Sequence, residues 1–303
     1  MPIRRGRRQI MRNNTPSSKY DAQNLFHSIG CAMRDGKNNK NATNYASMRT
    51  SVDQQLQNYD NAVAQQPNTL HSLTPLWPNK CPEKKTAYNM YKSDADEIQQ
   101  IRNDLMALNG SGKPYLCPIC ECEPVKHLDH YVPREIMPEF SIHPQNLIYT
   151  CKNCNEEKGT IWLDANQNRI VFNAYYDTPS GLDVLVCEVD KIENDLPVAE
   201  VKENGNIQHT AESARELATY RALKIIDVYQ SKVNDLMDSV CKMAQEETIR
   251  MKLDGKPIGD IWTYLSNEYQ NMLRRPGLNI IQRFVFSGLC NSHVMMGWLD
   301  SHS

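Results

Sequence analysis

The sequence predicts an α+β fold in which a small unit of two short strands and one helix lies between mainly helical flanks. Three observations predict it. Two Cys-x-x-Cys pairs, at 117–120 and 151–154, enclose two short apolar runs. β-rich runs and turn signals follow in 166–209, and a helical pattern of apolar residues fills 210–303. We therefore divide the chain into four regions, 1–110, 111–165, 166–209 and 210–303.

The first region is polar and basic. Residues 1–50 predict loops or a loosely packed start, followed by helices over 52–66 and 93–108. Prolines at 75, 78 and 82 exclude a single regular element across 71–85. The first twelve residues carry no acidic side chain, which suits either a solubilising tail or an arm that contacts nucleic acid. Their arginines are Arg4, Arg5, Arg7, Arg8 and Arg12.

The second region predicts a strand over 128–133, a second strand over 147–150 and a helix after Cys151. In the third region, 170–176, 184–189 and 198–201 read as short strands, with turns at Pro179-Ser180-Gly181 and Asn204-Gly205. The last region predicts a helix from Thr210 to the break at Gly255-Lys256-Pro257. A second helix over 258–273 and an apolar segment ending near Trp298 complete the chain.

The two Cys-x-x-Cys pairs predict a structural zinc site. Each short loop presents two thiolates, and four protein ligands leave no open position for water. A redox motif needs one such pair, so two pairs favour zinc. The predicted ligands are Cys117, Cys120, Cys151 and Cys154, with Cys122 and His127 as nearby competitors.

Charge and hydropathy narrow the classes of function. The net charge is −2, so any surface that binds a polyanion must be local. Residues 117–158 carry four positive and seven negative side chains, which makes substrate binding by the flanks, such as Arg274-Arg275 or the N-terminal arginines, the expectation. No apolar run reaches the roughly 18 residues of a membrane span, and no secretory signal is expected. We expect a soluble cytoplasmic protein without a membrane partner.

The predicted strands and helix would bring Asp129, His130 and Asn155 to one small cleft. Hydrolysis of a phosphodiester needs an activated water and a cation at the scissile phosphate. A neutral histidine can accept the proton of the water, while a carboxylate and an amide oxygen suit Mg²⁺. This set of residue types therefore predicts metal-dependent cleavage of a nucleic acid.

The segment resembles the HNH (His-Asn-His) endonuclease family, in the branch whose zinc knuckles use four cysteines. It shares Asp-His before two hydrophobic residues and proline, then Asn-Leu, then Cys-x-x-Cys-Asn and Lys. The resemblance implies a ββα-metal fold with His130 as general base, Asp129 and Asn155 as ligands of the catalytic metal, and Asn146 orienting the loop between the strands. Asn155 stands where the family name has its last histidine, which favours Mg²⁺ or Mn²⁺ over a second zinc.

The same resemblance implies an HNH endonuclease that hydrolyses DNA to 5′-phosphate and 3′-hydroxyl ends. The flanks are similar in size and layout to HNH proteins of bacterial anti-phage systems, some of which act beside an ATPase or a retron. RNA is an alternative substrate, and a catalytically silent zinc-ribbon binding module is an alternative function. Taken singly, Asp129-His130 suits a capped turn, Asn146 a turn and Asn155 a helix cap. His143 suits a loop, and Arg134 and Lys158 suit either phosphate contact or a solvated surface.

Overall fold

The computed structural model describes residues 20–35, 39–65, 69–92, 96–107, 116–177, 180 and 183–303. These residues form two compact units. The core unit contains the described residues up to 180 together with 214–223, and the C-terminal unit contains 183–213 and 224–303. The N-terminal arginines, the two ends of the helix expected over 93–108 and the turn residues Pro179 and Gly181 lie outside the described residues.

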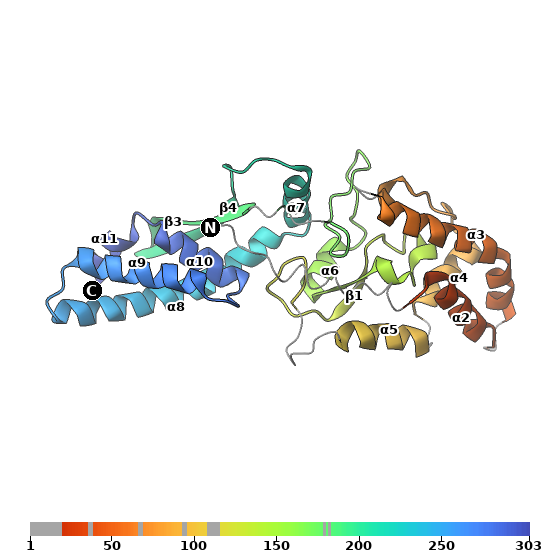
Figure 1. Ribbon diagram of the computed structural model, residues 1–303, viewed down its shortest axis with the longest axis horizontal. Coiled ribbons are helices and arrows are strands. Elements are labelled where there is room, and N and C mark those ends of the chain that lie inside the picture. Colours follow the sequence, from red (N-terminus) through yellow and green to blue (C-terminus); the bar gives the residue numbers. More distant parts are fainter. Residues whose placement is uncertain are drawn as a thin grey trace. The chain divides into compact units, whose positions relative to one another are not determined.

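The core unit combines helices with one two-stranded sheet (Figure 1). Its elements are α2 (Ala22–Asp35), α3 (Asn39–Ala64), η2 (Leu70–Ser72), α4 (Pro82–Met90), α5 (Asp96–Ala107), β1 (His127–His130), η3 (Pro138–Phe140), η4 (Pro144–Asn146), β2 (Leu147–Thr150), α6 (Lys152–Lys158) and most of α7 (Ala211–Ala222). The α+β class is confirmed, with helices predominating.

The N-terminal part of the core unit is more regular than its composition predicts. Residues 39–50, expected to be loop, belong to the 26-residue helix α3. Tyr45, Met48, Val52, Leu56, Tyr59 and Val63 are all buried. They recur every three or four residues on one face, which packs against α2 and α4. The many Asn, Ser and Thr residues between them hide this apolar face from a reading of composition.

The central strands pair antiparallel, with His130 opposite Leu147 and His127 opposite Thr150. Helix α6 follows β2 directly, and the Cys151 sulfur accepts a hydrogen bond from the Cys154 amide at the start of that helix. Both strands and the helix occur at the predicted positions, except that β1 ends at His130, before Pro133. The order strand, strand, helix therefore places the end of β1 beside α6, which contacts it.

The C-terminal unit contains β3 (Leu185–Glu193), β4 (Leu196–Glu203), α8 (Ile225–Leu253), α9 (Ile258–Arg274), α10 (Ile280–Cys290) and α11 (Met295–His302). Its two strands form an antiparallel hairpin, with β4 against α8 and β3 against α10 (Figure 1). The predicted break before α9 is present.

Three predictions for the chain after the central unit are corrected by the structure. Residues 170–176 form turns rather than a strand, because their amides bond to side chains: Phe172 donates to Thr219 and Asn173 donates to Asp177. The turn at Asn204-Gly205 is present but follows β4, and the hairpin reverses instead at Asn194-Asp195, two residues with positive φ. The helix expected from Thr210 divides at Lys224, whose left-handed backbone (φ 50°) separates α7 from α8.

Candidate functional site

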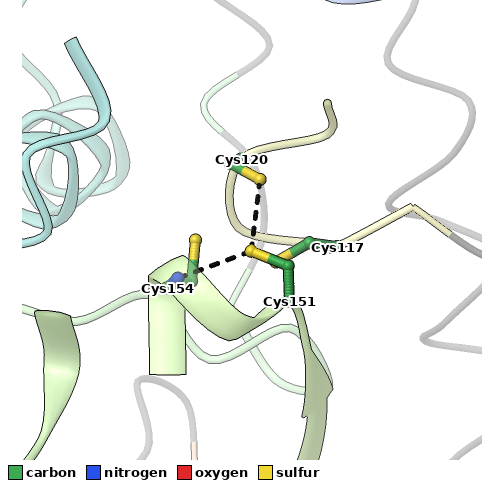
Figure 2. A group of neighbouring side chains, drawn as sticks. All are labelled: Cys117, Cys120, Cys151 and Cys154. Atoms are coloured by element: carbon green, nitrogen blue, oxygen red, sulfur yellow. Dashed lines mark hydrogen bonds between the residues drawn. The ribbon is translucent and has the colours of Figure 1, made fainter. Parts of the chain in front are cut away.

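Four cysteine sulfurs gather at the start of α6. Each of the four predicted ligands is buried, and their sulfurs all lie within 4.8 Å of one another (Figure 2). The distance from the Cys120 sulfur to the Cys151 sulfur is 3.8 Å. Tetrahedral zinc with Zn–S bonds of about 2.3 Å places its sulfurs about 3.8 Å apart. The cluster can therefore hold a zinc ion, and neither Cys122 nor His127 belongs to it.

Short backbone bonds shape the first pair of ligands. The Cys117 amide donates to the Glu123 carbonyl at 2.7 Å, and the chain turns through Glu121 at a positive φ of 55°. The second pair is fixed by the first turn of α6, where Cys151 precedes the helix and Cys154 lies inside it. Hydrogen bonds with Cys117 lower the pKa of the Cys120 and Cys151 thiols and raise the pKa of Cys154, while burial raises the pKa of Cys117 itself. Metals bind the thiolate form, so two of the four thiols favour it without an ion.

His130 lies at the end of β1, where it is buried and held by one hydrogen bond. Its Nε2 is 2.8 Å from the carbonyl oxygen of Ser141. A carbonyl only accepts, so Nε2 carries the proton and Nδ1 has a free lone pair in the neutral ring. The rings of His130 and Tyr91 also pack in a T-shaped arrangement, with centroids 4.4 Å apart.

The surroundings of His130 keep the imidazole neutral. Burial lowers the pKa of His130 to about 3, and the nearby cations of Arg134 and Lys158 act in the same direction. The Ser141 carbonyl opposes them, since its hydrogen bond favours a protonated ring. A neutral ring with a fixed tautomer is the form that can accept a proton.

Lys158 is buried beside Asp129, which corrects the expected surface or phosphate-binding position. Its ammonium lies 3.2 Å and 3.0 Å from the two Asp129 oxygens and 2.7 Å from the His130 carbonyl. The Lys158 side chain is 1% exposed. Burial still raises the pKa of Asp129, although Lys158 opposes this. Lys158 thus ties the last turn of α6 to the end of β1.

Asn155 lies on α6 between the cysteine cluster and Lys158. It follows Cys154 directly and is half-buried. Residues three apart on a helix share a face, so Asn155 lies on the face of α6 that carries Lys158 toward Asp129. The cysteine cluster and the ion pair together fix the helix that presents Asn155.

Asn146 holds the loop between the two strands. Its side-chain amide donates to the carbonyls of Val132 (3.0 Å) and Phe140 (3.1 Å). Its oxygen accepts from the Val132 amide at 2.8 Å and from the Tyr59 hydroxyl at 3.3 Å. Asn146 is fully buried. All of these hydrogen bonds join Asn146 to other residues of the chain, so its side chain holds the loop in shape.

Helix α3 braces the same loop through side chains that the sequence did not single out. The Tyr59 ring packs on His143 and Phe140, with centroid distances of 4.2 Å and 4.9 Å. His143 is buried, and its Nε2 lies 3.3 Å from a carboxylate oxygen of Asp60, so it is part of the loop's support. No short-range pattern connects Tyr59 with a loop more than 80 residues later.

Helix α4 also packs on this loop, and the sequence could have indicated this helix. Pro82 occupies its first turn and the Cys81 sulfur accepts from the Lys84 amide, which is a recognisable helix start. The Ser141 hydroxyl donates to the Ala87 carbonyl at 2.8 Å. Tyr91, at the end of this helix, supplies the ring against His130.

Two characterised proteins resemble parts of the chain. It is 34% identical to Septu protein PtuB of Bacillus thuringiensis over 86 residues, which cover 23% of this chain and 32% of that protein. It is 31% identical to protein ea31 of Escherichia phage lambda over 112 residues, 36% of this chain and 35% of that protein. The chain thus spans about a third of each relative. No family model matches, and no solved structure matches.

None of the described helices combines the length and the apolar character that crossing a membrane requires.

Proposed function

We propose that the protein is a metal-dependent HNH endonuclease that hydrolyses phosphodiester bonds of DNA. One observation carries the proposal: His130 is buried, neutral and fixed in one tautomer, with Asp129 next to it and the zinc-knuckle helix of Asn155 alongside. The resemblance of the central motif to HNH nucleases assigns matching roles to these residues.

In the proposed reaction His130 is the general base. Its Nδ1 accepts a proton from a water molecule, whose oxygen attacks the phosphorus while the bond to the 3′ oxygen breaks. The leaving 3′ oxygen takes a proton from solvent, so the products are a 5′-phosphate and a 3′-hydroxyl. The bond from His130 Nε2 to Ser141 keeps Nδ1 available and steadies the positive ring that forms.

Asp129 and Asn155 offer the oxygen donors that magnesium or manganese prefers. A divalent ion held by these two residues would supply positive charge at the scissile phosphate. The residue types fit such an ion, and Lys158 favours the ionised form of Asp129. Water and phosphate oxygens would complete its coordination.

A second function, a catalytically silent zinc-ribbon binding module, is favoured by one contact. The Lys158 ammonium lies within 3.2 Å of both carboxylate oxygens of Asp129, the residue that should hold the divalent ion. If this ion pair persists when magnesium is added, the acidic ligand is not available. The helical C-terminal unit would then serve assembly with other proteins.

Cleavage of plasmid DNA and of total RNA, with Mg²⁺, Mn²⁺ or EDTA, tests both proposals. We expect metal-dependent cleavage that falls about 10²–10⁴-fold in His130→Ala, with zinc content and fold unchanged. His71→Ala, an exposed histidine of the core unit, is the control and should cleave like the wild type. Loss of RNA but not DNA would change the substrate class to RNA. Equal behaviour of wild type and His130→Ala would favour the silent module.

The biological role that we propose is anti-phage defence, with a partner protein such as an ATPase or a retron-type complex. The similarity to Septu protein PtuB supports the defence role. Phage plating on cells that carry the gene with its neighbours should show protection, and His130→Ala should abolish it. Protection by the mutant equal to the wild type would contradict a role for the nuclease in defence.

A further inference from the structure

The positive charge that the central motif lacks is found on the helix that covers it. Residues 117–158 carry a net charge of −3. Residues 80–92, which contain α4, carry four lysines against one glutamate, a net charge of +3. This segment packs on the loop that follows His130, through Ser141 and Ala87. A basic helix therefore lies next to the candidate site within the core unit.

Aromatic rings and one guanidinium connect α4 to His130. The Tyr91 ring packs against His130, and the guanidinium carbon of Arg134 lies 5.3 Å from the Tyr91 centroid. The same guanidinium lies 4.4 Å from the centroid of Tyr88, one turn earlier. The exposed Lys92 ammonium lies 5.2 Å from the Tyr88 ring. These four residues, Tyr88, Tyr91, Lys92 and Arg134, form what we call the α4 cationic stack.

Arg134 is held by rings more than by hydrogen bonds. Its Nη1 is buried and has no hydrogen-bond partner. Its Nε lies 3.7 Å from the carboxylate of Glu135, a side chain that is 49% exposed. The Arg134 side chain as a whole is 19% exposed, and a phosphate oxygen is an acceptor that suits the donors of a guanidinium. The contact with the two rings orients the guanidinium, and its remaining donor capacity suits an anion.

We propose that the α4 cationic stack binds the backbone phosphates of the nucleic-acid strand beside the cleaved bond. This inference rests on the proposed nuclease function and adds to it the surface that holds the substrate. Arg134 would contact the phosphate nearest His130, and Lys92 would contact a neighbouring phosphate. Contacts of this kind position the strand and do not read its sequence.

Binding of fluorescent 20-nucleotide duplex and single-stranded oligonucleotides tests the surface directly. The zinc-loaded wild type and its variants are measured by anisotropy at several salt concentrations, without added magnesium or manganese. We expect Arg134→Gln to raise Kd about tenfold and Lys92→Gln about threefold, each reducing the salt slope by about one. The control is Lys126→Gln, an exposed lysine just before β1 and away from His130, which should bind within about twofold of wild type.

Two further measurements keep the test decisive. Zinc content and thermal unfolding confirm that Arg134→Gln is folded, and Lys92 is exposed, so its variant bypasses that concern. The form of the oligonucleotide that wild type binds more tightly identifies the preferred substrate. Wild-type affinity and salt slope in both variants, or a wild type that binds neither oligonucleotide, would overturn the inference.

Cleavage with magnesium separates this inference from the proposed function. If both variants bind weakly but the wild type does not cleave, the surface stands and the nuclease fails. If the wild type cleaves and Arg134→Gln retains its Kd and KM, the nuclease stands and the surface fails. If both the nuclease and the phosphate-binding surface are correct, Arg134→Gln should increase KM by a larger factor than it decreases kcat.

Discussion

The two ends of helix α6 are held by different chemistry. At its start, Cys151 and Cys154 join two other buried sulfurs in a cluster that suits zinc. At its end, Lys158 pairs with Asp129 and with the His130 carbonyl. Seven residues of helix span about 10 Å, so the two sites are close but separate. Helix α6 therefore carries a cysteine cluster at its start and a buried ion pair at its end, and the two share no residue.

Removing one cysteine of the cluster at the start of α6 should have the largest effect on stability. Replacing Cys154 with Ser removes one thiolate, and structural zinc sites contribute about 10–16 kcal/mol of binding free energy to folding. We expect loss of stoichiometric zinc and a core unit that no longer unfolds cooperatively. Metal analysis and calorimetry would show this, with Cys31→Ser, an exposed cysteine, as control. A Cys154→Ser protein with full zinc and unchanged unfolding would contradict a four-cysteine site.

Breaking the ion pair between Lys158 and Asp129 should reduce the stability of the protein by a smaller amount. Replacing Lys158 with Met leaves the buried Asp129 carboxylate without its cation, which should reduce the free energy of unfolding by about 4 kcal/mol. The double variant Asp129→Asn with Lys158→Met removes both charges and should recover much of that loss. Denaturation by urea measures both. If the double variant were as unstable as the sum of the two single variants, the pair would not be coupled.

Removing the uncharged side chain of Asn146, which holds the loop between β1 and β2, should have an intermediate effect on stability. Asn146→Ala removes four hydrogen bonds and takes from the buried amide and carbonyl of Val132 their partner, while the Phe140 carbonyl keeps its bond from the His143 amide. We expect the free energy of unfolding to fall by about 3 kcal/mol, with zinc retained. The exposed Asn61→Ala on α3 is a matched control and should be near wild type. A stable Asn146→Ala protein would mean that other contacts, such as Tyr59 on Phe140, are sufficient to hold the loop.

The spacing of the cysteines predicted the cluster at the start of α6, whereas no sequence pattern predicted the ion pair at its end. Four cysteines in two Cys-x-x-Cys pairs have few arrangements that satisfy zinc, so local sequence identifies the cluster. A lysine in the last turn of a short helix is usually solvated, and nothing near Lys158 in sequence indicates its burial. Its partner Asp129 is 29 residues away, and only the pairing of β1 with β2 brings them together.

Tertiary contacts also explain why some predicted elements are misplaced. Residues 170–176 have types that favour a strand, but two of their backbone amides donate hydrogen bonds to the side chains of Thr219 and Asp177. These partners act through tertiary contacts, which propensity does not include. The α4 cationic stack was missed for a related reason, because Tyr88 and Tyr91 contact Arg134, which lies more than 40 residues later in the chain.

The smallest predicted effect concerns the pH dependence contributed by His130. Burial lowers its pKa to about 3 in the folded chain, whereas an unfolded histidine titrates near 6.5. Between these values the unfolded state binds one more proton, so acidification below pH 6.5 should destabilise the protein. The loss attributable to His130 should reach about 2 kcal/mol at pH 5. Urea unfolding of wild type and His130→Asn, zinc-loaded and without magnesium, isolates this contribution.

The comparison between the two proteins removes the effects of other groups. Acid also protonates the zinc ligands, but it does so equally in both proteins, so only the difference between their slopes reports on His130. We expect wild type to lose stability more steeply than His130→Asn from pH 6.5 to pH 5. Parallel slopes would mean that His130 protonates in the folded state near its ordinary pKa. The ring would then be more open to solvent than its bond to Ser141 and its contact with Tyr91 imply.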